Sequence, residues 1–221
     1  MTYEFDIAVI GAGPAGQIAA IAMARGGRRV VLVGPEPDGS DRRTTALMDQ
    51  SIAFLESLGI WERVRPEAAK LAVMQIIDAT GRLLHAPTVN FRAAEIGLDA
   101  FGYNIPNAPF QAILAAELAT TSNITIRTNS VAQADLPSEA ARLILDDGSL
   151  IETELVIAAD GRKSLMRKTA GISVDTKNYP QTAVVLNFAH ERPHGSVSTE
   201  FHTRTGPFTQ VPLPGNRSSL V

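Results

Sequence analysis

The chain has 221 residues, of which 45% are hydrophobic and 19% are charged, and its formal net charge is −3. This composition predicts a folded protein with a sizeable core and argues against a disordered chain or a general nucleic-acid-binding protein. The absence of cysteine excludes disulfides, thiolate metal sites and cysteine nucleophiles. No signal-peptide pattern is visible and no apolar run approaches the ~20 residues of a membrane span, so we expect a cytoplasmic protein.

A glycine-rich turn lies near the N-terminus, where residues 6–16 read DIAVIGAGPAG. The apolar run before the glycines is typical of a strand buried on both faces of a parallel sheet, and the apolar residues after them predict a helix. Gly11 would permit a sharp turn, Gly13 would let a pyrophosphate approach the backbone, and Gly16 would let the helix pack on the strand. With a second strand over 28–33, the pattern predicts a dinucleotide site whose phosphates face the helix N-terminus.

The acidic residue that usually completes such a site is missing from its place. A dinucleotide site has a carboxylate about 20 residues beyond the glycines, at the end of the second strand, where it holds the ribose. Gly34 occupies that place, and Glu36 follows two residues later. Glu36 is either a substitute ribose ligand or a solvated acid in the polar loop over 34–43, and both interpretations remain open.

The elements after this loop are predicted from their apolar spacing and turn residues. Arg42 and Arg43, at the end of the loop, can hold an anion bidentately or can be a solvated pair. A helix is predicted over 44–59, with a stop at Gly59, and a hairpin within 71–91 around residues 78–81. A second helix begins at Asn107 and is followed by a strand over 123–128. A second hairpin turns at Asp147-Gly148, and an apolar strand covers 155–159. Strands over 182–188, 196–201 and 209–213 then predict an antiparallel sheet in a second domain.

Asp160 and Gly161 directly follow the last apolar strand before that sheet. Ligands bind at the carboxyl ends of the strands in open α/β sheets, so this pair is a candidate ligand site. Asp160 also suits the cap of a following helix, and the two roles are compatible. Residues 190–194 read HERPH and match the zinc motif HExxH, but Pro193 would lie inside the helix that the motif needs. We therefore expect no metal site there.

Several further segments complete the sequence pattern: GAGPAG at 11–16 is followed by DRRTTAL at 41–47, FLESLGIW at 54–61, GYNIPN at 102–107 with Gln111, ADGRKSLMRK at 159–168, HERPHGSVSTEF at 190–201 and GPFTQVPLPGNRSSLV at 206–221. Together these motifs resemble those of the flavin-dependent aromatic hydroxylases of the para-hydroxybenzoate hydroxylase type, and most of all the ubiquinone-biosynthesis hydroxylases. The motifs span nearly the whole chain, and their combination in this order is more specific than any single motif.

The resemblance implies an α/β fold, in which a Rossmann-like FAD-binding domain of three-layer architecture is followed by the start of a mostly antiparallel β substrate domain. The implied bounds are 1–70 and 100–172 for the FAD-binding domain, 71–99 for an inserted hairpin, and 173–221 for an incomplete substrate domain. Together with the interpretation of the residues above, the resemblance gives these predicted cofactor-binding residues: Gly11, Ala12, Gly13, Pro14, Ala15, Gly16, Glu36, Arg43, Gln111, Val131, Asp160 and Gly161. By resemblance, Arg43 and Gln111 lie near the flavin, while Asp160 and Gly161 lie near the pyrophosphate and ribitol.

The resemblance also implies an activity. FAD would be the bound cofactor, NAD(P)H the reductant and O2 the oxidant in the hydroxylation of an electron-rich aromatic ring, so the hard chemistry belongs to the cofactor and we name no catalytic acid or base. The implied substrate is a polyprenylated phenol of ubiquinone biosynthesis. A lipid-tailed substrate implies contact with a membrane surface or a biosynthetic complex, and no nucleic-acid partner is expected.

Two departures from the family pattern affect these expectations. Gly34 replaces the ribose-binding acid, and a third flavin motif, a Gly-Asp pair, would lie beyond Val221. We therefore expect that the 221-residue chain is a fragment that binds FAD poorly and has no hydroxylase turnover by itself. Two other functions compete: an NAD-dependent dehydrogenase, which would not predict the Asp160-Gly161 pair, and a non-enzymatic binding protein on a decayed flavoprotein scaffold, which the missing acid favours.

Overall fold

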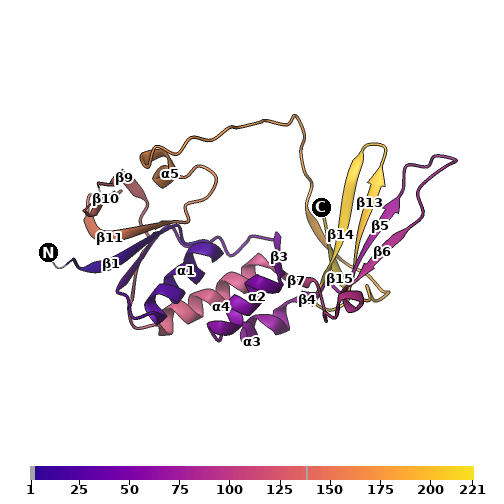
Figure 1. Ribbon diagram of the computed structural model, residues 1–221, viewed down its shortest axis with the longest axis horizontal. Helices are drawn as coiled ribbons and strands as arrows, with labels where there is room; N and C mark the ends of the chain where they lie inside the picture. The colour runs from indigo at the N-terminus through magenta and orange to yellow at the C-terminus, as the bar shows by residue number, and fades with distance from the viewer. Residues whose placement is uncertain (1–2, 138) are drawn as a thin grey trace. The chain divides into compact units, whose positions relative to one another are not determined.

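The computed structural model of the protein describes residues 3–137 and 139–221 (Figure 1). The chain divides into two compact units, each made of two segments. Unit 1 comprises Met1–Gly39 and Gln111–Tyr179, and unit 2 comprises Ser40–Phe110 and Pro180–Val221. Within the described residues, no helix is both long and apolar enough to cross a membrane.

Unit 1 is built on a six-stranded mixed sheet with the order β8-β2-β1-β11-β10-β9. Its elements are β1 (Phe5–Ile10), α1 (Pro14–Arg25), β2 (Val30–Val33), the part of α4 (Asn107–Thr120) from Gln111 on, β8 (Ile124–Arg127), β9 (Val131–Asp135), β10 (Ala141–Leu145), β11 (Leu150–Ala158) and α5 (Leu165–Thr169). The strands β8, β2, β1 and β11 are parallel neighbours, whereas β10 pairs antiparallel with β11 and with β9. The predicted α/β fold is confirmed.

The strands β1 and β2 are buried on both faces, as their apolar runs predict. Side chains alternate along a strand, and Ala8 and Ile10 of β1 pack with Val31 and Val33 of β2 into one cluster that includes Met166 of α5. The residues between them, such as Val9, are buried on the other face, where α1 packs on both strands (Figure 1). This double burial fixes the carboxyl ends of the strands, where the glycine turn begins.

Unit 2 contains two sheets. The smaller sheet has the order β3-β7-β4, and the larger has the order β12-β15-β14-β13-β5-β6. Their strands are β3 (Thr44–Met48), β4 (Ala69–Lys70), β5 (Val73–Asp78), β6 (Val89–Arg92), β7 (Gly102–Pro106), β12 (Leu186–Ala189), β13 (Val197–Thr203), β14 (Gly206–Leu213) and β15 (Arg217–Leu220). The helices of the unit are α2 (Asp49–Ser57), α3 (Trp61–Val64), the first turn of α4, and the 3-10 turns η1 (Arg65–Glu67) and η2 (Ala93–Ile96).

The larger sheet is antiparallel except for one parallel pair, β13 with β5. The predicted antiparallel sheet is therefore confirmed, with β5 of the earlier hairpin added beside β13. The buried amide of Asn104 on β7 donates a hydrogen bond to the carbonyl of Pro212 on β14 at 2.9 Å, which ties the small sheet to the large one.

One predicted helix is wrong at its start. Residues 44–48 form the strand β3, and α2 begins only at Asp49. The strand pairs antiparallel with β7, which lies much later in the chain, and this long-range ladder overrides the local apolar spacing. The predicted stop is confirmed, because α2 ends two residues before Gly59, whose φ of +59° suits a residue without a side chain.

The remaining boundaries differ from the predictions by a few residues. The hairpin at Asp147-Gly148 is confirmed, and Gly148 has the φ of +82° expected in its turn. The earlier hairpin is also present, but β5 and β6 are joined by a loop over 79–88 rather than by a turn at 78–81. The strand predicted over 182–188 begins only at Leu186, and the strand predicted over 155–159 is the second half of β11. The boundaries of the two compact units differ from those of the predicted domains. The assignment of the predicted domains to FAD and substrate binding stays a prediction.

Candidate functional site

A cavity of about 530 Å³ lies in unit 1 at the carboxyl ends of β1, β2 and β11. Cofactor and small-molecule pockets measure roughly 300–1,000 Å³, and open α/β sheets bind their ligands at this edge. Of the residues predicted to bind a cofactor, those that line the cavity are Gly11, Ala12, Gly13, Glu36, Gln111, Val131, Asp160 and Gly161. Four predicted residues do not line it: Pro14, Ala15, Gly16 and Arg43.

The three glycines of the turn differ in what surrounds them. Gly11 has a φ of +109°, and a Cβ there would overlap the carbonyl oxygen of Ala159 beside it. A Cβ on Gly16 would overlap the carbonyl oxygen of Gly11, so the helix and the turn can approach each other only without a side chain. Gly13 has an ordinary φ of −69°, and a Cβ there would meet nothing within 4 Å. Gly11 and Gly16 are therefore required by the backbone, whereas Gly13 leaves empty space beside the cavity.

The N-terminus of α1 begins at this empty space. Gly13 is the N-cap residue, Pro14 is the first helical residue, no side chain caps the helix and no acidic residue lies in its first turn. The first-turn N–H groups and the positive end of the helix dipole are thus left for an anionic group. Gln17, which is 1% exposed, donates from Nε2 to the carbonyl of Ala12 at 2.7 Å and holds the turn in place.

Two buried acceptor atoms in the cavity lining have no hydrogen-bond partner among the described residues. They are Oε1 of Gln111, on α4, and Oδ1 of Asp160, after β11. The other oxygen of Asp160 accepts the backbone N–H of Met166 at 3.1 Å, so the capping role of Asp160 is confirmed for that oxygen. Ser164 completes the cap of α5 by accepting the N–H of Arg167 at 2.9 Å. A buried acceptor without a donor costs free energy, and a bound ligand that donates a hydrogen bond would recover it.

The end of β2 has no room for the usual acid. A Cβ on Gly34 would lie 2.6 Å from the backbone nitrogen of Ala12, and the N–H of Gly34 donates to the carbonyl of Arg127 at 3.0 Å. With the backbone held in this way, a carboxylate side chain at position 34 would displace the glycine turn. Glu36 is exposed and lines the cavity two residues further on.

Arg43 belongs to unit 2 and binds an anion of its own chain. Its Nε and Nη2 atoms each donate to one carboxylate oxygen of Asp41 at 2.8 Å, and the amide of Asn107 donates to the same carboxylate at 2.9 Å. The hydrogen bonds from Arg43, followed by the one from Asn107, hold the pKa of Asp41 well below its usual value. The carbonyl of Arg42 accepts a hydrogen bond from the amide of Asn187 at 2.8 Å.

Sequence reasoning missed two polar residues of the cavity lining, Lys163 and Ser130. Lys163 lies two residues beyond Gly161, so proximity to that motif was the only available signal. Ser130 is held by a contact that no local pattern reveals: its N–H donates to the carboxylate of Asp146 at 3.1 Å, and the amide of Asn129 donates to the same group. These hydrogen bonds, first that of Asn129, lower the pKa of Asp146.

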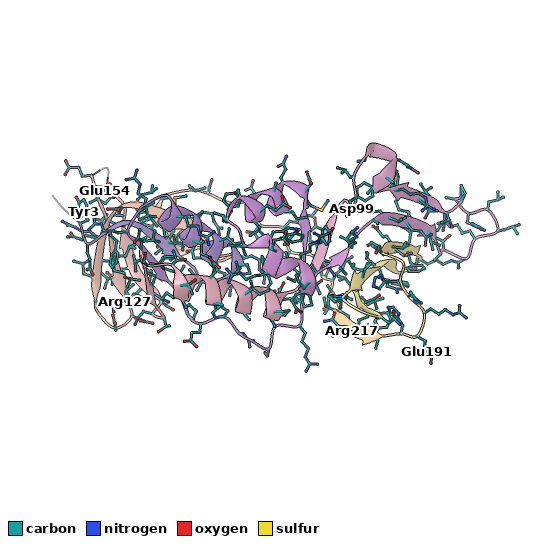
Figure 2. All side chains as sticks on the ribbon, turned by 90° about the horizontal axis from the view of Figure 1, so that it is seen from below. Tyr3, Asp99, Arg127, Glu154, Glu191 and Arg217 are labelled. Atoms are coloured by element: carbon teal, nitrogen blue, oxygen red, sulfur yellow. The ribbon has the colours of Figure 1, made fainter. Side chains whose placement is uncertain are left out.

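The HERPH segment does not meet the geometry of a zinc motif. It lies in turns between β12 and β13, and its glutamate, Glu191, is exposed to solvent (Figure 2). The ring of His190 contacts the hydroxyl of Ser218 at 3.0 Å, and Nδ1 of His194 accepts the N–H of Ser196 at 3.0 Å. In the part of the chain that the structure describes, no three His, Cys, Asp or Glu side chains are grouped so as to hold a metal ion.

Residues 4–215 match the model of the FAD binding domain family. The chain belongs to this family. It is 32% identical to ubiquinone hydroxylase UbiL of Rhodospirillum rubrum over 98% of its length, and 29% identical to 3-demethoxyubiquinol 3-hydroxylase of Escherichia coli over 98% of its length. These matches cover 51% and 56% of the two relatives, so the chain spans about half the length of the curated relatives it matches.

The fold of this chain is also found in solved structures. Pseudomonas aeruginosa PqsL in complex with 2-aminobenzoylacetate superposes with a TM-score of 0.79 at 21% identity, and the match covers 98% of this chain and 59% of PqsL. This likeness confirms the fold. The chain thus combines an FAD-binding fold with a cavity at the strand ends.

The cavity fits the group that the family binds. FAD carries a pyrophosphate, which suits the N-terminus of α1 and the empty space beside Gly13. It also carries hydroxyl and N–H donors, which suit the buried acceptors on Gln111 and Asp160. The chemistry of the lining therefore agrees with the family assignment.

Proposed function

We propose that this chain forms the FAD-binding part of a flavin-dependent hydroxylase that acts on the aromatic ring of a polyprenylated phenol in ubiquinone biosynthesis. The observation that carries the proposal is the cavity of unit 1, where an uncapped helix N-terminus, empty space beside Gly13 and two unpaired buried acceptors meet. The names of the two ubiquinone hydroxylases among the relatives support the substrate class.

When bound and reduced by NAD(P)H, FAD supplies the activation of O2 for hydroxylation. The residues of this chain bind and orient. The backbone of the glycine turn and the first turn of α1 hold the pyrophosphate, and Oδ1 of Asp160 and Oε1 of Gln111 accept hydrogen bonds from the cofactor. Glu36 accepts from the ribose in place of the acid that Gly34 excludes. The protein acts in the cytoplasm, on a lipid-tailed substrate at a membrane surface.

Glu36 is the residue on which this proposal can be tested most locally. In the Glu36→Gln variant, we expect the affinity for FAD to fall about tenfold, because hydrogen bonds to a charged acceptor contribute ~1.5–3 kcal/mol. The measurement is a titration followed by flavin fluorescence. The matched control is Glu154→Gln, which changes an exposed acid of unit 1 that does not line the cavity. If both variants bind FAD with the affinity of the wild type, Glu36 is a solvated loop acid and not a ribose ligand.

A second candidate function is a non-enzymatic binding protein on the same scaffold. Gly34 favours it, because the usual ribose ligand has no room at the end of β2. The two candidates differ in turnover. A longer product of the reading frame, supplied with FAD, NAD(P)H, O2 and a polyprenylated phenol, should yield the hydroxylated ring, measured by mass spectrometry. The 221-residue chain alone should give no such product. FAD binding without hydroxylation by any product would favour the second candidate.

A further inference from the structure

The tip of the β5–β6 hairpin exposes two leucines almost completely. Leu83 is 98% exposed and Leu84 is 88% exposed, the highest values among the large hydrophobic side chains of the described residues. Every residue from 81 to 90 is exposed, and Figure 1 shows this loop, in purple, projecting from the end of the hairpin. Two adjacent leucines in water forgo the free energy that burial of such side chains provides, so they are unusual in a surface loop.

The loop is held in place by hydrogen bonds at both of its ends. The carboxylate of Asp78 accepts the N–H of Thr80 with one oxygen and the N–H of Ala86 with the other, each at 3.0 Å. Arg204, in the turn between β13 and β14, donates from Nε to the carbonyl of Thr80 at 2.7 Å. The leucines are therefore presented by an ordered loop that is tied to the neighbouring turn.

The apolar surface continues from the tip along one face of the hairpin. Met74 pairs with Phe91 across the two strands, and Ile76 pairs with Val89. Directly paired residues point to the same face of a sheet, and each of these four side chains is between 38% and 50% exposed. On the next strand, Glu200 shares this face with His202, whose Nε2 atom lies 3.0 Å from the Glu200 carboxylate.

Basic side chains flank the tip. Arg82 directly precedes the two leucines and is exposed, and Arg204 adjoins the loop. The nearest acid, Asp78, accepts backbone N–H groups with both oxygens and keeps its negative charge. Arg82 and Arg204 therefore leave the tip with a formal excess of one positive charge beside the two projecting leucines, which suits the interface of an anionic lipid surface.

We infer that the 79–88 loop, which we term the leucine tip, inserts Leu83 and Leu84 into the surface of a membrane with anionic headgroups while Arg82 and Arg204 contact those headgroups. A projecting pair of leucines fits the acyl boundary of a bilayer, where the chains adapt to the loop, whereas a protein partner would need a concave site shaped to it. The inference rests on the tip alone and does not depend on FAD binding or hydroxylation.

The test is flotation of the chain with vesicles of phosphatidylcholine, with and without phosphatidylglycerol. We expect the wild type to float with the anionic vesicles. The bound-to-free ratio of the Leu83→Ser/Leu84→Ser variant should be lower by about tenfold or more, because the variant lacks the two apolar side chains that enter the bilayer. Arg82→Gln should lower the ratio about fivefold, and only on the anionic vesicles, since a basic residue near such a surface contributes ~1 kcal/mol.

The matched control is Leu150→Ser/Leu155→Ser, which removes two leucines of unit 1 that are 57% and 53% exposed, and it should float like the wild type. Circular dichroism of each variant establishes that it is folded.

The inference is overturned if the tip variant floats like the wild type, or if the wild type does not float. It is equally overturned if sedimentation velocity without lipid reveals a dimer that only the tip variant dissociates, because the tip would then bind a second copy. FAD titration of the tip variant should match the wild type, which separates this test from that of the proposed function.

Discussion

The glycine turn of unit 1 is closely packed against neighbouring backbone, whereas the β5–β6 hairpin of unit 2 is largely exposed to solvent. At the turn, Gly11 and Gly16 lie so close to neighbouring backbone that no side chain fits, and β1 and β2 are buried on both faces. On the hairpin, all four residues of β6 are exposed and the apolar pairs with β5 face solvent. The close packing around the glycine turn fixes the backbone beside the cavity proposed to bind FAD. The exposed side chains of the hairpin leave an apolar surface, which we propose contacts a membrane. The predictions below test how far this difference in crowding decides the effect of a substitution.

The largest effect is expected in the glycine turn itself. Gly11→Ala should lower the free energy of unfolding by at least about 3 kcal/mol, because it adds a Cβ that overlaps Ala159 and places it on a backbone with positive φ. The measurement is urea unfolding followed by circular dichroism. Gly13→Ala is the matched control and should change stability by less than about 1 kcal/mol, since its Cβ meets nothing within 4 Å. Similar losses in both variants would mean that crowding does not distinguish the two glycines.

A smaller effect is expected inside unit 2, where Asn104 joins the two sheets. Asn104→Ala should lower the free energy of unfolding by about 2 kcal/mol, because it leaves the carbonyl of Pro212 without its buried donor. Asn90→Ala, on the exposed strand β6, should change it by less than about 0.5 kcal/mol. If both substitutions cost the same in urea unfolding, the contrast between buried and exposed parts of unit 2 would be wrong.

The smallest effect concerns acid stability. Hydrogen bonds from Arg43, and then from Asn107, keep the pKa of Asp41 below the value of 3.8 that applies in the unfolded chain. A lowered pKa in the folded state contributes stability above about pH 4, and this contribution is lost as the pH falls through the folded-state pKa. Because Arg43 is 73% exposed, the contribution should be less than about 1 kcal/mol.

In the Asp41→Asn variant, the urea midpoint should therefore fall less steeply with decreasing pH than it does in the wild type. The control is Asp49→Asn, which changes an acid in the first turn of α2. A wild-type slope in the Asp41 variant would show that this carboxylate does not contribute to the acid sensitivity of folding.

Most of the cavity could be predicted from the sequence because its parts are local patterns. The glycine turn and Glu36 follow the buried strands β1 and β2, the Asp160-Gly161 pair follows β11, and the carboxyl ends of parallel strands meet at one edge. The strand β3 could not be predicted, because its partner β7 comes from a distant segment. The bidentate contact between Arg43 and Asp41 could not be predicted either, because the sequence around Arg43 is the same whether its side chain is solvated or binds an anion.

The central claim is that the cavity of unit 1 binds the pyrophosphate of FAD beside Gly13. Its most direct test is an FAD titration of the wild-type chain and of the Gly13→Ala variant, followed by flavin fluorescence. We predict weak but measurable binding by the wild type and at least about tenfold weaker binding by the variant, because the added methyl group occupies the space beside the cavity. The free energy of unfolding of the variant should differ from that of the wild type by less than about 1 kcal/mol. Equal affinities, or no binding by the wild type, would contradict the claim.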